Sequence, residues 1–433
     1  MTYKDTLEYL YHRLPMFSRV GAVAYKEDLH NTLALCASLG DPHRKIRTIH
    51  IAGTNGKGSV SHMLAAILQC SGYRTGLYTS PHLKDFRERI RIDGAMVSED
   101  FVVSFTEKVM PMIDRISPSF FEITVAMAFD HFVENRVDVA VIETGLGGRL
   151  DSTNVITPEL SVITNIGWDH MNILGNTIPA IAAEKAGIIK QDIPVVIGET
   201  DPETEKVFRD KAAASMSPIH FADSQWEIIG ATNNGRHLEL RVRHVADGRT
   251  ADYALDLTGI YQMKNLVTVL EAVDRLRSVG WKIPDDKLRL GLSQTKKLTG
   301  LHGRWELIRE RPMLVADVAH NEPGMRQLIA QIAATPHRRL HIVMGMVRDK
   351  DPSRLLMMLP LNATFYFTMA GIERALPAED LKEMAAACGH NGNAYPNVNA
   401  AIDAALSSAD EEDLIVVCGS IFLVGEINML SVD

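Results

Sequence analysis

The pattern of hydrophobic and polar positions divides most of the chain into blocks in which short apolar runs alternate with longer amphipathic stretches. Such alternation predicts a mostly parallel sheet with helices on both faces. In the first block the expected strands are 48–52, 75–79, 137–143, 160–164 and 194–197, and the expected helices are 100–115, 121–135 and 178–189, with another beginning near residue 59.

The segments before and after this first α/β block show other patterns. The opening residues predict amphipathic helices over 2–14 and 26–39, and a helix expected over 263–279 is followed by a polar, linker-like stretch that reaches residue 300. Before that helix, alternating side chains with Asn-Gly and Asp-Gly turns predict a small antiparallel sheet. Its expected strands are 226–230, 237–242 and 251–257.

From about residue 301 the alternation of strands and helices restarts, which predicts a second doubly wound, Rossmann-like domain. The expected strands are 313–317, 340–344, 364–368 and 414–418, and the expected helices are 323–334, 352–359, 377–388, 398–408 and 421–430. The chain is therefore expected to be an α/β protein with domains 1–298 and 299–433.

Composition narrows the class of protein. Lys and Arg total 45 against 54 for Asp and Glu, a net charge of −9, which argues against a protein that coats nucleic acid. Hydrophobic residues make up 46% and charged residues 23%, as in ordinary globular proteins. No apolar stretch reaches about 18 residues and no signal-peptide pattern opens the chain, so no membrane association is expected. The cysteines Cys36, Cys70, Cys388 and Cys418 lie far apart without metal-ligand spacing, which indicates reduced thiols in a cytoplasmic protein.

A glycine-rich segment, Gly53–Ser59, lies between the expected strand 48–52 and the following helix. Glycines let backbone N–H groups turn toward phosphate oxygens, the helix N-terminus adds partial positive charge, and Lys57 adds a full charge. The spelling departs from GxxxxGK[ST], because Gly58 intervenes before Ser59 and position 51 is Ile51. A glycine-rich turn with an incidental lysine is the alternative, but the strand–loop–helix order favours a P-loop-like ATP site. Its expected binding residues are Thr54, Asn55, Gly56, Lys57, Gly58 and Ser59.

A series of further motifs follows this loop along the chain. They are Thr79–Leu83 (TSPHL), Glu143–Asn154 (ETGLGGRLDSTN), Asp169–His170, Glu184–Ile188 (EKAGI), Asp317–Asn321 (DVAHN) and Gly419–Glu426 (GSIFLVGE). Together with GTNGKGS, this ordered set closely resembles the folylpolyglutamate synthase/dihydrofolate synthase family, which is related to the Mur ligases. The resemblance extends from about residue 48 to residue 426.

The resemblance implies an ATP-dependent ligase that joins the carboxylate of a folate or dihydropteroate to the amino group of L-glutamate and releases ADP and phosphate. A carboxylate is a poor electrophile, and its phosphorylation to an acyl phosphate supplies a good leaving group. ATP is the expected phosphoryl donor. Because phosphoryl transfer between anions requires positive charge, Mg²⁺ is expected beside ATP together with the catalytic Lys57. Closure of one domain over the other would keep water from the acyl phosphate. The implied partners are small molecules, and the enzyme is expected to be a monomer.

The resemblance places the metal on Ser80, Glu143 and His170, and it gives His170 a catalytic role as well. Glu143 ends the apolar strand expected over 137–143, where ligand residues of open α/β sheets gather. A salt bridge at the strand end is the alternative for Glu143, and a capping hydroxyl is the alternative for Ser80. His170 gains weight only from its place beside Asp169, because imidazole is an unusual ligand of magnesium.

Two more charged side chains are candidates for the catalytic step. Lys185 lies in the expected helix 178–189, and the resemblance implies that this lysine can be carbamylated, whereas an exposed helix face is the alternative. Arg304 follows His302 and Gly303 in an element that resembles the family's P-G-R-x-E, with His302 in place of Pro. It is expected to reach the ATP phosphates as an arginine finger in cis, and an interdomain salt bridge is the alternative.

Two motifs imply the remaining nucleotide contacts. The element that begins at Gly259 resembles G-x-H-Q-x-x-N, whose Asn contacts the nucleotide; Asn265 is present, but Tyr261 stands at the His position. Asp317 ends an expected strand of the second domain and is implied to bind the ribose or adenine side of ATP, with His320 nearby. A local helix cap is the alternative for His320 and the residue after it.

The motifs say less about the pterin and glutamate sites. A pterin pocket should be apolar with a few fixed polar groups, although aromatic residues at helical spacing usually belong to a core. The expected pterin-site residues are Phe121, Leu150, Asp151 and Ser152. For glutamate, Ser420 and residues 348–351 are candidates, and capping of the final helix is the alternative for Ser420.

Two rival functions remain to be weighed. A Mur-type ligase that extends a UDP-sugar precursor would be expected to carry an additional N-terminal UDP-binding domain, yet the phosphate loop begins near residue 53. The spellings GTNGKGS and TSPHL also favour the folate branch. A module that hydrolyses ATP without forming a bond would need neither the second Rossmann-like domain nor the additional ligand set. Phosphate release that requires both substrates would distinguish a ligase from such a module.

Overall fold

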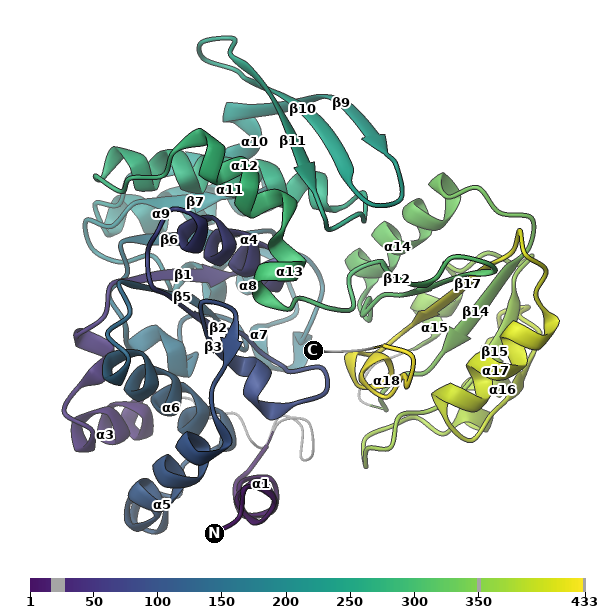
Figure 1. The fold of residues 1–433 in the computed structure, drawn as a ribbon, viewed down its shortest axis with the longest axis horizontal. Coiled ribbons are helices and arrows are strands. Elements are labelled where there is room, and N and C mark those ends of the chain that lie inside the picture. The colour runs from purple at the N-terminus through teal and green to yellow at the C-terminus, as the bar shows by residue number, and fades with distance from the viewer. Residues whose placement is uncertain (17–27, 349–351, 431–433) are drawn as a thin grey trace. The chain divides into compact units, whose positions relative to one another are not determined.

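In the computed structural model, which describes residues 1–16, 28–348 and 352–430, the chain folds into two compact units (Figure 1). The first unit contains Met1–Asp256 and Gln262–Leu301, and the second contains Leu257–Tyr261 and His302–Asp433. Each unit is built on its own mixed sheet covered by helices, so the expected α/β class is confirmed. Among the described helices, none combines the length and the apolar character needed to cross a membrane.

The first unit contains an eight-stranded sheet in the order β4-β3-β2-β5-β1-β6-β7-β8. From β2 to β8 all neighbours are parallel, while β3 runs antiparallel to both β2 and β4. The strands β3, β4 and β8 were not expected, because runs of two or three residues are too short to establish a two-residue period. The bounds are β1 (Thr48–Ala52), β2 (Thr75–Tyr78), β3 (Ile90–Ile92), β4 (Ala95–Met96), β5 (Val139–Glu143), β6 (Leu160–Ile163), β7 (Val195–Ile197) and β8 (Ile219–Phe221).

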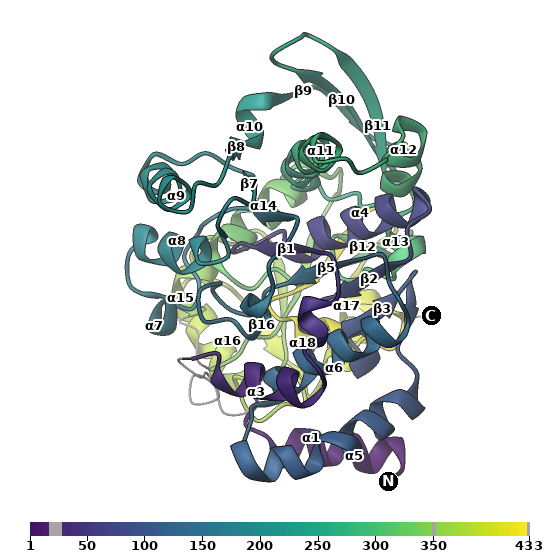
Figure 2. The ribbon, with the colours of Figure 1, turned by 90° about the vertical axis from the view of Figure 1, so that its left-hand side faces the viewer.

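Helices cover both faces of this sheet, as Figure 2 shows. The helices α4 (Lys57–Cys70) and α11 (Gln262–Ser278) pack on one face, and α6 (Phe120–Glu134) and α8 (Ile178–Ala186) pack on the other. The expected helix 26–39 is observed as α3 from His30, while residues 26 and 27 lie outside the described residues. The other helices of this unit are α1 (Tyr3–Arg13), α3 (His30–Ser38), η2 (Pro42–Arg44), η3 (Phe86–Arg89), α5 (Glu99–Ile116), η4 (Ser152–Val155), α7 (Met171–Leu174), α9 (Pro202–Ala214), α10 (Ala222–Gln225), α12 (Asp285–Ser293) and α13 (Thr295–Thr299).

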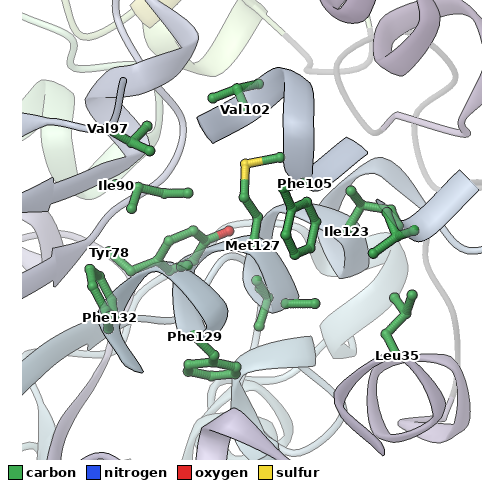
Figure 3. Packing of buried hydrophobic residues seen from close by; sticks show 14 of the residues in the cluster. Leu35, Tyr78, Ile90, Val97, Val102, Phe105, Ile123, Met127, Phe129 and Phe132 are labelled. Carbon is green, nitrogen blue, oxygen red and sulfur yellow. The ribbon is translucent and has the colours of Figure 1, made fainter. Parts of the chain in front are cut away.

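A hydrophobic core of the first unit lies between α6 and the strands β2 and β5 (Figure 3). The helix α6 is buried on most sides, and a capping box at Ser119 and Glu122 satisfies N–H groups at its start. Aromatic side chains, among them Tyr78, Phe129 and Phe132, fill this core, and the Tyr78 hydroxyl bonds Thr124 at 3.0 Å. Burial of these side chains anchors the strands whose carboxyl ends carry the candidate site.

The small antiparallel sheet is confirmed, with strands β9 (Trp226–Asn233), β10 (Leu238–His244) and β11 (Thr250–Leu255). The expected linker up to residue 300 is wrong, because α12 and α13 occupy most of it. Among its charged residues, α12 carries an apolar stripe in which Leu288 and Leu292 are buried. A Cβ on Gly291 would lie 2.7 Å from the Ile67 backbone of α4. This segment therefore packs as part of the first unit.

The second unit contains a six-stranded sheet in the order β12-β13-β17-β14-β15-β16, parallel except for the β12–β13 pair. The helices α14, α15 and α16 cover one face, and α17 covers the other. The helix expected over 421–430 ends at Gly425. The bounds are β12 (Glu306–Arg309), β13 (Met313–Ala316), α14 (Glu322–Ala334), β14 (Leu340–Met344), α15 (Pro352–Leu356), β15 (Thr364–Phe367), α16 (Ala378–Ala387), β16 (Gly392–Ala394), α17 (Val398–Ser408), β17 (Leu414–Cys418) and α18 (Ile421–Gly425).

Candidate functional site

The glycine-rich loop connects β1 to α4 at the carboxyl edge of the first sheet. Gly53 and Gly56 have φ values of 146° and 84°, which residues with a side chain rarely adopt. The helix α4 begins at Lys57, whose Nζ donates hydrogen bonds to the carbonyl oxygens of Gly53 at 3.1 Å and Thr54 at 3.2 Å. The loop therefore combines a helix N-terminus with a lysine held over its turn, as phosphate binding requires.

The segment after β6 holds this loop in place. The backbone N–H of Thr54 donates to the carbonyl of Asn165 at 2.9 Å, and the N–H of Asn55 donates to the Asn165 side chain at 3.0 Å. The Thr164 hydroxyl donates to the carbonyl of Asn55 at 2.6 Å. Because β6 neighbours β1 in the sheet, these bonds fix the loop against the adjacent strand end.

The first turn of α11 contacts the other side of the loop. A Cβ on Gly56 would lie 2.4 Å from the Asn265 Oδ1 atom, so the glycine allows the amide to approach the backbone. Asn265 Nδ2 donates to Gln262 Oε1 at 2.7 Å, and Gln262 Nε2 donates to the Ser59 hydroxyl at 3.1 Å. The structure thus brings Asn265 and the loop residues together in one site.

Lys185 of α8 is buried in this site and does not lie on an exposed helix face, with 4% of its surface accessible. Its Nζ donates to the carbonyl of Gly53 at 2.9 Å, so Lys57 and Lys185 meet at the same oxygen. Burial and the nearby Lys57 lower the pKa of Lys185 to about 7, against an opposing influence of Asp169 and Asp151. A buried amine with this pKa carries a neutral fraction that can act as a nucleophile at physiological pH.

The expected metal ligands lie near the ends of β2, β5 and β6. The Ser80 backbone N–H donates to Glu143 Oε2 at 3.2 Å, and the Glu143 side chain is buried. His170 adopts a φ of 50° and lies beside Asp169, with 3.8 Å between Nε2 and Oδ1. Within the described ranges, no group of three or more His, Cys, Asp or Glu side chains is arranged to hold a metal ion.

The expected pterin-site residues gather around the loop that follows β5. The Phe121 ring packs on Gly145, since a Cβ there would meet its Cζ at 2.4 Å. Asp151 is buried, and one of its oxygens accepts the N–H of Leu146 at 2.7 Å. Leu150 and Ser152 flank Asp151 along the chain. An aromatic ring and a fixed carboxylate therefore contact neighbouring residues of the same short loop.

In the second unit, Asp317 follows β13 and holds two connecting segments. Its Oδ2 accepts the Tyr261 hydroxyl at 2.7 Å and the backbone N–H of Trp305 at 2.9 Å. Its Oδ1 accepts the N–H of Ala319 at 2.9 Å. Burial raises the pKa of Asp317, and these donors together with the nearby Arg304 oppose that shift. Tyr261, which stands at the histidine position of the G-x-H-Q-x-x-N element, therefore bonds directly to Asp317, the residue expected to bind the nucleotide.

Two other expected residues of the second unit, His320 and Ser420, make local contacts. The His320 Nδ1 atom lies 2.8 Å from the carbonyl of Val318, and the neighbouring Asn321 caps α14. Ser420 caps α18 by accepting the N–H of Phe422 at 3.2 Å. This contact agrees with the alternative for Ser420, the capping of the final helix. Of the glutamate candidates 348–351, residues 349–351 lie outside the described residues.

Sequence reasoning missed the residues that clamp the phosphate loop, Thr164 and Asn165. Thr164 is the last residue of the strand expected over 160–164, and Asn165 follows it. Because the carboxyl ends of parallel strands share one edge of a sheet, position alone could have indicated both residues. It also missed His50, whose Nε2 atom lies 2.8 Å from the Thr153 hydroxyl. That contact joins residues 103 positions apart, and no local pattern predicts it.

Models of two protein families match the chain. The Mur ligase middle domain matches residues 51–273, which contain the phosphate loop, Glu143, Lys185 and Asn265. The Mur ligase glutamate ligase domain matches residues 303–421, which contain Arg304 and Asp317.

Similar proteins match over nearly the whole chain. Folylpolyglutamate synthase of Lacticaseibacillus casei is 32% identical, with 99% of this chain and 98% of that protein covered. Dihydrofolate synthase/folylpolyglutamate synthase of Bacillus subtilis (strain 168) is 33% identical, with 98% of each covered. The solved structure of Mycobacterium tuberculosis folylpolyglutamate synthase complexed with ADP superposes with a TM-score of 0.87 at 32% identity, covering 98% of this chain and 96% of that one.

Proposed function

The chain belongs to the folylpolyglutamate synthase/dihydrofolate synthase family of Mur ligases, and from this premise we propose how its residues catalyse ligation. It is an ATP-dependent ligase that adds L-glutamate to the carboxylate of a folate or dihydropteroate, referred to below as the pterin substrate. The observation that carries this proposal is the loop between β1 and α4, over which Lys57 and Lys185 donate to one carbonyl oxygen. We assign residues 1–298 to the ATP-binding domain and residues 299–433 to the glutamate-ligase domain, which contributes further contacts to ATP.

The reaction begins with transfer of the γ-phosphoryl group to the pterin substrate's carboxylate, which forms an acyl phosphate. The amino group of glutamate then attacks the acyl carbon, and phosphate leaves. Lys57 and the loop N–H groups stabilise the negative charge that accumulates during phosphoryl transfer. The loop from Thr54 to Ser59, with Asn265, holds the nucleotide, as the ADP complex of the M. tuberculosis relative supports.

The donor set of the first unit fits Mg²⁺. Glu143 offers a buried carboxylate at the end of β5. The backbone N–H of Ser80 bonds that carboxylate, so the hydroxyl of the same residue lies nearby. His170 is the third expected ligand. Hard oxygen ligands from one or two residues, with phosphate oxygens completing the set, are what Mg²⁺ prefers. When bound, the ion supplies positive charge to the phosphate oxygens. The protein residues orient those oxygens toward the pterin substrate's carboxylate.

Carbamylation of Lys185 is part of this proposal. The neutral amine attacks carbon dioxide, a new N–C bond forms, and the amine loses a proton, so that a buried cation becomes an anion. The depressed pKa of Lys185, about 7, favours this reaction because it supplies the neutral amine. Incubation with ¹³C-bicarbonate tests it: a carbamate carbon signal is expected for the native enzyme and is expected to be lost in Lys185→Met. A native enzyme without such a signal contradicts carbamylation.

In the second unit, Arg304 supplies positive charge to the ATP phosphates, and Asp317 and His320 bind the nucleoside side of ATP. Asp317 is already held by three hydrogen bonds, so its carboxylate is preorganised. Ser420, at the start of α18, is the proposed glutamate contact. Phe121, Leu150, Asp151 and Ser152 form the pterin site.

Phosphate release measures the proposed function directly. Four mixtures are compared: ATP alone, ATP with glutamate, ATP with the pterin substrate, and all three together, with dihydropteroate and a reduced folate tested separately. Sustained release is expected only in the complete mixtures, together with a product that is one glutamate heavier. Release at the same rate without the pterin substrate and without glutamate would contradict a ligase.

A further inference from the structure

A buried chain of hydrogen bonds connects β1 to the expected pterin site. His50 lies in the middle of β1 and is fully buried, and its Nε2 atom lies 2.8 Å from the Thr153 hydroxyl. The same hydroxyl bonds Asp151 Oδ1 at 2.5 Å, and the Thr153 backbone N–H donates to that oxygen at 3.0 Å. Three residues that the established chemistry does not connect thus form one network inside the first unit.

The geometry fixes the direction of each bond in this network. Burial raises the pKa of Asp151, and backbone N–H groups that donate to both of its oxygens, including that of Leu146, oppose this shift by stabilising the ionised carboxylate. The Thr153 hydroxyl therefore gives its proton to Asp151, and its remaining lone pair accepts the N–H at Nε2 of His50. Nδ1 of His50 is then the unprotonated nitrogen, and it is buried without a hydrogen-bond partner among the described residues.

The surroundings keep this imidazole neutral. Burial, together with the nearby Lys190, lowers the pKa of His50 to about 3. A buried histidine with one orphaned nitrogen is costly, since an unsatisfied buried polar atom destabilises the fold. A leucine has about the same volume as histidine and would occupy the strand position without that cost, so packing alone does not explain the imidazole.

The network ends at the loop that carries the pterin site. Asp151 Oδ2 accepts the N–H of Leu146 at 2.7 Å, and the N–H of Gly145 also bonds this carboxylate. The Phe121 ring packs directly on Gly145. Any shift of Asp151 therefore moves the loop backbone and the aromatic surface beside it.

We propose that His50 is a positioning residue for the pterin substrate, which acts by holding Thr153 and Asp151 and through them the loop at Gly145 and Leu146. This inference rests on the proposed function, because it assigns Asp151 and Phe121 to the pterin site. It adds a residue on the strand that leads into the phosphate loop, so the same strand positions both substrates. His50 itself touches neither.

The test compares two variants at one position. His50→Leu removes the donor, whereas His50→Gln retains an N–H near the position of Nε2. We expect His50→Leu to raise the KM for the pterin substrate by about tenfold, the size of one lost hydrogen bond, and to leave the KM for ATP within about twofold of the native value. His50→Gln is expected to restore most of the native KM for the pterin substrate.

His43→Leu is the matched control, since His43 is also buried in this unit, on η2. It is expected to change neither KM, whatever it does to thermal stability. An unchanged KM for the pterin substrate in His50→Leu, or an equal rise of both KM values, would overturn the inference. Should His50→Leu fail to fold, Thr153→Val compared with Thr153→Ser decides in the same way, because only Ser keeps the hydroxyl. A native enzyme without pterin-dependent phosphate release would instead contradict the proposed function.

Discussion

At the scale of single residues, the most informative contact is the one that Lys57 and Lys185 share. Both ammonium groups donate to the carbonyl of Gly53, at 3.1 Å and 2.9 Å. Burial and, to a smaller extent, repulsion by the nearby Lys57 lower the pKa of Lys185 to about 7. The site therefore holds the Lys57 side chain and, at the same carbonyl oxygen, the amine of Lys185, whose charge varies with pH near neutrality.

Replacement of Lys57 should abolish the reaction without unfolding the protein. For Lys57→Ala we expect the rate of glutamate-dependent phosphate release to fall by about a thousandfold, because the charge acts on the transferring phosphoryl group. Circular dichroism should remain native. Lys206→Ala, which removes an exposed lysine of α9, is the control and should keep full activity. Near-normal turnover in Lys57→Ala would show that the loop does not bind the phosphates.

The variable charge predicts a specific dependence of stability on pH. The folded-state pKa of Lys185, about 7, lies below its ordinary value of 10.5, so between these limits the unfolded chain binds more protons. The free energy of unfolding should therefore rise with pH from about 7 to about 10, by up to ~1.4 kcal/mol per pH unit from this group.

Urea unfolding of the native protein and of Lys185→Met, in buffer free of carbon dioxide, measures this contribution. The difference between the two proteins should increase in favour of the native protein across that interval and stay constant below it. A difference that does not change with pH would mean that Lys185 is charged in the folded protein.

At the scale of elements, periodicity predicted the long strands and helices, and motif order predicted the phosphate loop. Periodicity did not predict helices that depend on tertiary packing. The helix α12 is stabilised by burial of Leu288 and Leu292 against α4, although the charged composition of this stretch is typical of a linker. The same limit applies to the site. Ser420 and Asn321 match their helix-capping alternatives because caps are local, whereas the clamp by Asn165 is non-local and has no nearby sequence pattern.

The contact between the phosphate loop and α11 leads to a prediction about two glycines. Gly56 and Gly72 both have positive φ, 84° and 90°, but only Gly56 faces another element, the Asn265 side chain. Alanine at either position should cost about 1 kcal/mol of stability through backbone strain. Only Gly56→Ala should also raise the KM for ATP, by about tenfold or more, because it displaces Asn265. Equal KM values for the two variants would contradict the role of this contact.

At the scale of the whole molecule, residues 257–261 belong to the second unit, and α11, which follows directly, belongs to the first. Tyr261 donates to Asp317, and the N–H of Ile260 donates to the Gln331 side chain at 2.6 Å. The next residue, Gln262, bonds Ser59 at the phosphate loop. Tyr261 and Gln262 are consecutive in the chain. Tyr261 thus bonds a proposed nucleotide-binding residue of the second unit, and Gln262 bonds one of the first unit.

Tyr261→Phe tests this anchor. Loss of one hydrogen bond to buried Asp317 should lower the stability of the second unit by about 1 kcal/mol and raise the KM for ATP several-fold. Tyr395→Phe, remote from Asp317 in the chain, should leave the KM for ATP unchanged. Calorimetry combined with steady-state kinetics separates the two effects. A Tyr261→Phe variant with native affinity for ATP would show that the hydroxyl does not position Asp317 for the nucleotide.

The central claim is that the pterin substrate's carboxylate is phosphorylated before glutamate attacks it. Synthesis of the pterin substrate with ¹⁸O in that carboxylate, followed by mass spectrometry of the released phosphate, tests the claim most directly. We expect one ¹⁸O atom in each phosphate formed in the complete reaction, because the C–O bond breaks when glutamate attacks the acyl phosphate. Phosphate that contains no ¹⁸O while the amide product forms would contradict this account.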